Sequence, residues 1–203
     1  MYTPLSIDSV AVGWTIATQT LLINLSFLAG YLLDQRMTTL TNLSFDLNSV
    51  SLGAIFGLGM ALLGAIADTL PIFKDITRDT RMFTLRLLGR DTSAISALGT
   101  ALLLSLGAGI AEEAFFRGVV FNVANWAIGV PGAFIVSSGL FALGHFPVWG
   151  ANAFNEAFLG GIFCFCYYYS GYNLAVPIIA HALVYHNHHH YHYIISLLLS
   201  SLV

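Results

Sequence analysis

The chain has 203 residues, of which 57% are hydrophobic and only 8% are charged, whereas about a quarter of the residues of a soluble domain are charged. This composition and a mean hydropathy of +0.80 argue against a water-soluble protein. The net charge of −3 and the lack of a basic stripe with interleaved aromatics argue against a nucleic-acid partner. We therefore expect an all-α, polytopic transmembrane helical bundle in a lipid bilayer, with about six membrane-embedded helices in a single domain over residues 1–203.

The first two expected spans are residues 10–33 and residues 50–73. The first contains no charged residue. At about 1.5 Å per residue it is long enough to cross a hydrocarbon core of about 30 Å. The second is rich in glycine and alanine, and such small residues let membrane helices approach one another closely.

Basic residues are concentrated in residues 74–90, which hold five of the seven lysines and arginines. Loops rich in these residues stay on the cytoplasmic side of a membrane or on its equivalent, such as the stroma. We therefore expect this loop on the cytoplasmic or stromal side, and the N-terminus with it, because two spans precede the loop. A bacterial plasma membrane, a thylakoid and the endoplasmic reticulum all fit this prediction.

The next predicted element is a long helix over residues 93–125. It is too long for a simple span, so we expect it to protrude or to kink near Gly107 or Gly109. A following helix is predicted to open at Pro131 and to end at Phe146, with Pro147 as the stop and His145 at the helix end.

Two more helices complete the predicted bundle. Residues 151–170 end in Tyr167–Tyr169, which resembles the aromatic belt of a lipid–water boundary. Cys164 and Cys166 lie inside this apolar run without zinc-module spacing, so we interpret them as packing residues. The last helix is predicted to start at Leu174 with Pro177 in its first turn.

Two of the three glutamates of the chain, Glu112 and Glu113, are adjacent within an apolar helix. Each central charge in a membrane helix costs about 2.5–3.5 kcal/mol, so such residues face a partner or a cavity and are functional candidates. Arg117 follows Glu113 by one helical turn and can pair with it. Glu112 points about 100° away, and a carboxylate without a partner in a dry site can act as a general base.

His145 and His181 are the natural companions of this glutamate pair. Each is a single imidazole in an apolar helix with no charged neighbour in the sequence. Phe141 lies one turn before His145 and can line the same site. The alternative is structural, because a Glu–Arg pair can serve as a packing clamp and a lone histidine can bond a backbone carbonyl.

Three motifs in this order resemble one known family. They are the Glu-Glu-x-x-x-Arg run at Glu112–Arg117, the Phe-x-x-x-His run at Phe141–His145, and His181 within the sequence of residues 171–183. Together they resemble the CAAX-protease and bacteriocin-processing family, also called CPBP or Abi, over roughly residues 93–185.

The resemblance implies an intramembrane glutamic endopeptidase that acts on a peptide or membrane-protein substrate without a cofactor. Glu112 and His145 would activate a water molecule, and His181 would help to stabilise the oxyanion. Glu113 and Arg117 would organise the site.

One position departs from the family pattern. The third motif usually continues with asparagine or aspartate four residues after its histidine, and Tyr185 stands at the matching position. A tyrosine hydroxyl can donate a hydrogen bond, but it reaches further than a short amide. This departure favours a second hypothesis, a catalytically inactive relative that serves as a membrane scaffold or as a subunit of a larger membrane complex.

Metal binding and transport are weaker alternatives. The histidine-rich run His186–His192 can bind a metal or form an interfacial loop. Two histidines and one carboxylate, here His145, His181 and Glu112, form a set that suits zinc. A transporter is disfavoured, because the sequence has no paired interrupted segments in two matching halves.

Overall fold

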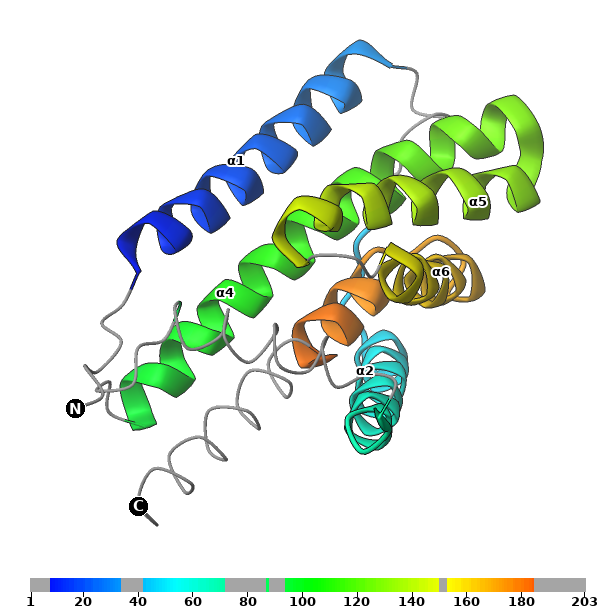
Figure 1. The fold of residues 1–203 in the computed structure, drawn as a ribbon. Coiled ribbons are helices and arrows are strands. Elements are labelled where there is room, and N and C mark those ends of the chain that lie inside the picture. The colour runs from blue at the N-terminus through cyan, green and yellow to red at the C-terminus, as the bar shows by residue number, and fades with distance from the viewer. Residues whose placement is uncertain (1–7, 34–41, 72–86, 88–93, 150–152, 185–203) are drawn as a thin grey trace, which may run out of the picture.

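The computed structural model describes residues 8–33, 42–71, 87, 94–149 and 153–184. Apart from short loops and turns, these residues are helical and contain no strand, which confirms the all-α prediction. The elements are α1 (Ser9–Leu32), α2 (Leu47–Ala67), α4 (Ala94–Phe115), the π-helix η3 (Phe116–Phe121), α5 (Asn122–Trp149), α6 (Ala153–Tyr169) and a last helix, Ala175–Val184 (Figure 1).

Three helical segments among the described residues are long and apolar enough to cross a membrane: Ser9–Leu32, Leu47–Ala67 and Gly99–His145. Large apolar side chains face outward, as shown by Trp14, Leu103 and Ile135, which are 71%, 73% and 75% exposed. A helix with apolar residues on all sides suits lipid. The chain is therefore an integral membrane helical bundle, whereas the expected count of six embedded helices is not confirmed.

The first two spans begin at aspartate caps. The carboxylate of Asp8 accepts hydrogen bonds from the first-turn amides of α1, and Asp46 accepts one from the amide of Ser49 in α2. These caps satisfy amides that have no partner within the helix. The bounds of α1 match the prediction to within one residue, but α2 ends at Ala67, because Asp68 begins a turn.

The expected kink near Gly107 or Gly109 is wrong, because α4 continues through both glycines to Phe115. The irregular segment comes next, where η3 widens the helix. Its freed carbonyls find side-chain donors: Asn122 Nδ2 donates to Arg117 O and Gly118 O, and Ser137 Oγ donates to Phe116 O. Single π-turns of this kind are frequent at functional sites.

A break at Gly129 turns the chain back within α5. This glycine has φ +77° and ψ 174°, a conformation that side-chain-bearing residues rarely adopt. The helix after the break continues to Trp149, so the prediction that Pro147 ends it is wrong and His145 lies inside the helix. A proline removes one i→i−4 hydrogen bond, and here that loss falls in the final turn, where few helical bonds remain.

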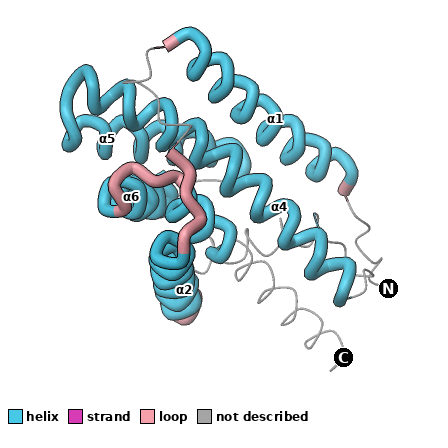
Figure 2. Tube along the Cα trace, turned by 180° about the vertical axis from the view of Figure 1, so that it is seen from behind, coloured by secondary structure: helices cyan, strands magenta, loops and turns pink. Residues whose placement is uncertain are grey.

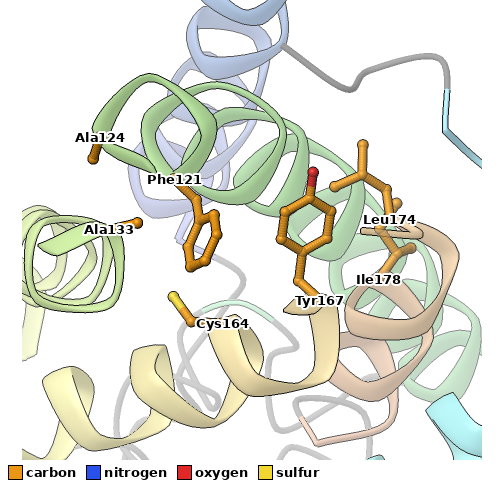
Figure 3. Packing of buried hydrophobic residues seen from close by; sticks show 7 residues of the cluster. All are labelled: Phe121, Ala124, Ala133, Cys164, Tyr167, Leu174 and Ile178. Carbon is orange, nitrogen blue, oxygen red and sulfur yellow. The ribbon is translucent and has the colours of Figure 1, made fainter. Parts of the chain in front are cut away.

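Helix α6 packs against α5, and both helices contribute residues to the hydrophobic cluster drawn in Figure 3. Tyr167 is fully buried there, and its hydroxyl accepts a hydrogen bond of 2.8 Å from Asn122. It is therefore not part of an aromatic belt, whereas Tyr168 and Tyr169 are exposed. Both cysteines are buried and unlinked, as expected for packing residues.

Helix α2 packs tightly against the helix Ala175–Val184 through two glycines. A Cβ atom at Gly53 would lie 2.9 Å from Val176 O, and one at Gly57 would lie 2.9 Å from Ala180 O. The loops at one end of these helices are joined by hydrogen bonds between Ser44 and Asn173, and Figure 2 shows the two loops side by side.

Candidate active site

A buried ion network lies between three helices. Glu113 Oε1 lies 3.1 Å from Arg117 Nη1 and 2.7 Å from His181 Nδ1, and all three side chains are fully buried. Arg117 Nη2 also donates to the backbone carbonyl of Gly160 in α6, over 2.7 Å. The network therefore links α4 and η3 to α6 and to the last helix, and the pairing of Glu113 with Arg117 follows the i, i+4 spacing.

Aromatic rings enclose this network. The guanidinium carbon of Arg117 lies 4.8 Å from the ring centre of Phe141 and 5.3 Å from that of Phe163. The Phe163 ring stacks on His181, with centroids 4.6 Å apart and an angle of 8° between the planes. Rings over a cation add an attractive electrostatic contribution, and their packing excludes water from the ion pair.

Glu112 and His145 form the accessible part of the site. Glu112 Oε2 lies 3.6 Å from His145 Nε2 and 3.8 Å from His181 Nε2. The side chains of Glu112 and His145 are 15% and 12% exposed, whereas that of His181 is completely buried. The opening of the site is therefore beside Glu112 and His145, with His181 behind them.

The hydrogen bonds of the two histidines restrict their tautomers. His145 Nδ1 lies 2.8 Å from the backbone oxygen of Phe141, and because a carbonyl only accepts, Nδ1 carries the proton. In the neutral ring, Nε2 then presents a lone pair toward Glu112. His181 Nδ1 likewise donates to the Glu113 carboxylate, so a proton on its Nε2 requires the doubly protonated ring.

The distances from Glu112 to the two histidines exceed direct hydrogen-bond range, and polar groups at such separations can share a bridging water. A water held there can donate to Glu112 Oε2 and to His145 Nε2, which are both acceptors. This is the arrangement that general-base activation of water requires.

The structure brings together Glu112, Glu113, Arg117, Phe141, His145 and His181 from separate parts of the sequence. Tyr185 and the run His186–His192 lie outside the described residues. No group of three or more His, Cys, Asp or Glu side chains arranged to hold a metal ion occurs within the described part of the chain.

Several residues of the site were not recognised in the sequence. Asn122 donates a hydrogen bond to the backbone oxygen of Arg117, and Phe163 stacks on the ring of His181. Gly160 contributes its backbone carbonyl, which accepts a hydrogen bond from Arg117. Glu156, the third glutamate, lies in the first turn of α6 and interacts electrostatically with His145 and Glu112. The scarcity of glutamate in the chain was the one sequence signal for this residue.

Comparison with known families gives a match over the part of the chain that contains this site. Residues 94–186 match the family described as Type II CAAX prenyl endopeptidase Rce1-like. The searches of curated proteins and of solved structures found no match. The matched segment contains all three motifs and every helix of the site. Residues 94–186 are therefore similar to the Rce1-like group of type II CAAX prenyl endopeptidases.

Proposed function

We propose that the chain is an intramembrane endopeptidase in which Glu112 and His145 activate water to hydrolyse a peptide bond. The observation that carries the proposal is the position of Glu112 Oε2, 3.6 Å and 3.8 Å from the Nε2 atoms of two histidines at the accessible end of a buried ion network. The family match supports a peptidase of this class.

In the proposed reaction, the water oxygen forms a bond to the carbonyl carbon of the peptide while Glu112 takes one water proton. The carbonyl π-electrons move to the oxygen and give a tetrahedral oxyanion. The C–N bond then breaks, its electron pair stays on nitrogen, and the proton held by Glu112 passes to the leaving amine. His145 Nε2 orients the water by accepting its second hydrogen bond, because Nδ1 already donates to Phe141 O.

The remaining residues are proposed to position these groups. Glu113 receives hydrogen bonds from Arg117 and His181 and so holds the His181 ring in one orientation. His181 stabilises the oxyanion when Nε2 carries a proton. Phe141 supports both Arg117 and His145 through ring contacts. We assign Tyr185 a supporting role after the third motif, where it replaces the usual amide or carboxylate.

The substrate of this site is a peptide or a membrane protein in the lipid bilayer. We propose that residues 1–203 form one transmembrane domain, with the basic loop at residues 74–90 and the N-terminus on the cytoplasmic or stromal side. No cofactor is required in this mechanism, because the glutamate–histidine pair supplies the base.

The test is cleavage of a membrane-protein peptide library by the purified protein in nanodiscs. Glu112→Gln and His145→Ala should each lower kcat/KM at least ~100-fold, the lower end of the contribution of a positioned base. Asp8→Asn, a carboxylate-to-amide change at the cap of α1, is the matched control and should retain activity. A chelator should not change the rate, since the proposed base is a carboxylate.

The opposite result favours the scaffold hypothesis, for which Tyr185 is the specific observation. If the wild type cleaves nothing, Tyr185→Asn creates cleavage and a membrane subunit co-purifies in stable stoichiometry, then the native chain binds rather than hydrolyses. Cleavage that survives Glu112→Gln would contradict the proposed base directly.

A further inference from the structure

The helices α5 and α6 are in contact around Ser138 and Gly160. Ser138 Oγ lies 3.7 Å from Cys164 Sγ. A Cβ atom at Gly160 would lie 3.2 Å from Ser138 Cα and 3.4 Å from Phe141 Cβ. Glu156 lies one helical turn before Gly160 in α6, and His145 lies one turn after Phe141 in α5, so both residues flank this contact.

The neighbours of Glu156 agree with this placement. Its electrostatic interactions are with His145, Glu112 and His181, and its carboxylate takes a hydrogen bond from Asn155. The side chain is half-buried. Its Oε2 atom is buried and accepts no hydrogen bond from the described residues. A hydrogen-bond donor would stabilise a buried carboxylate oxygen in this state, and the described part of the chain does not supply one.

The charges around the opening are unbalanced. Arg117 is the sole lysine or arginine among the described residues. Its Nη1 atom pairs with Glu113, and its Nη2 atom donates to Gly160 O. Among the described residues, the basic side chains near the carboxylates of Glu112 and Glu156 are His145 and His181. His145 is neutral in the proposed mechanism, so no lysine or arginine of the described residues balances the two carboxylates. A cationic group brought by the substrate can supply both the missing charge and the missing donor.

We propose that Glu156 is a specificity-determining residue that binds a lysine or arginine side chain of the peptide substrate next to the scissile bond. This inference rests on the proposed function, because the scissile bond is placed at Glu112 and His145. Packed helix axes are about 8–10 Å apart, and consecutive Cα atoms of a peptide are about 3.8 Å apart. The cationic residue therefore lies within about two positions of the cleaved bond.

The experiment uses pairs of peptides, one pair for each position around the cleavage site. The two members of a pair differ only at that position, which holds lysine in one peptide and norleucine in the other. The wild type in nanodiscs should cleave the lysine peptide with about tenfold higher kcat/KM, the effect expected for a charge-assisted hydrogen bond. Glu156→Gln should remove this preference, and Glu156→Lys should favour a glutamate peptide over the norleucine peptide. Asp8→Asn removes a distant carboxylate and should keep the lysine preference.

The ratio between two peptides on one protein sample does not depend on the folded fraction, so a poorly folding variant remains informative. If Glu156→Gln lowers cleavage of both peptides equally, Glu156 acts through His145 and the specificity proposal is overturned. An unchanged lysine preference in Glu156→Gln overturns it as well.

Binding of the same fluorescent peptides separates this proposal from the peptidase proposal. If no peptide is cleaved but the wild type binds the lysine peptide about tenfold more tightly, and Glu156→Gln loses that difference, the cation site stands and the hydrolytic function falls. Equal binding of both peptides in the absence of cleavage overturns both proposals.

Discussion

His181 donates from Nδ1 to Glu113 Oε1 over 2.7 Å, although the two residues are 68 positions apart in the chain. The same oxygen accepts a hydrogen bond from Arg117. One buried carboxylate atom thus connects the first and third sequence motifs and determines how the histidine ring is held. The relationship makes Glu113 a residue whose loss affects both folding and the site.

Glu113→Ala should strongly destabilise the protein. The substitution leaves Arg117 and His181 buried without their carboxylate, and breaking a buried ion pair from one side costs about 3–5 kcal/mol. Reversible unfolding in mixed micelles, followed by tryptophan fluorescence, measures this loss. Glu113→Gln keeps an acceptor of the same shape and should lose less. Equal stability of Glu113→Ala and wild type would show that the network is not a stabilising element.

Gly57→Leu should separate α2 from the helix that carries His181. Any Cβ atom at this position meets the backbone oxygen of Ala180 at 2.9 Å, which cannot move like a flexible side-chain end. Overpacking of this kind costs about 1–3 kcal/mol, and the shifted helix should also lower any hydrolytic activity. The measurement is the thermal midpoint in nanodiscs together with kcat/KM.

Gly59→Ala is the matched control for that experiment, because nothing lies within 4 Å of a Cβ atom at Gly59. Alanine in a helix interior is favoured over glycine by up to about 1 kcal/mol, so this variant should be as stable as the wild type or more stable. Equal destabilisation by both variants would contradict close packing at Gly57.

Asn122→Leu should destabilise the π-helix. The Asn122 amide donates to Arg117 O, Gly118 O and the Tyr167 hydroxyl, so leucine leaves these acceptors without that donor. An unsatisfied buried polar group costs about 1–3 kcal/mol. Tyr167→Phe removes only one of the three contacts and should cost less. Thermal unfolding of both variants checks the order, and a larger effect of Tyr167→Phe would contradict it.

The cap of α2 should weaken only in strong acid. The backbone amide of Ser49 and the hydroxyls of Ser44 and Ser49 hold the pKa of Asp46 below its usual value of 3.8. A carboxylate with a lowered folded-state pKa adds stability above its unfolded pKa and loses it as the pH falls through the folded value. The capping contribution should therefore be constant from neutral pH to about 5 and should decline below about 4.

Asp46→Asn is the comparison for this pH dependence, since asparagine can cap a helix but does not titrate. The difference in thermal midpoint between wild type and Asp46→Asn should stay constant at neutral pH and change only in the acid range. A change between pH 7 and pH 5 would show that another group is responsible.

Much of the fold could be predicted because helical periodicity and lipid compatibility are local properties. The apolar composition determined an all-helical membrane protein, and the spacing of Glu113 and Arg117 determined their pairing within one turn. The first span was predicted to within one residue, because it lacks charges and Asp8 provides a cap. The family resemblance was also readable, since its motifs are short and ordered along the chain.

Only the tertiary structure decided how these helices meet. The π-turn after Phe115 and the break at Gly129 depend on side-chain donors and on a backbone conformation that no periodic pattern encodes. The stack of Phe163 on His181, the carbonyl of Gly160 at Arg117, and the electrostatic interaction of Glu156 with His145 all follow from the packing between helices. This packing joins segments that are far apart in the sequence, so residues with equal local patterns can lie in the site or outside it.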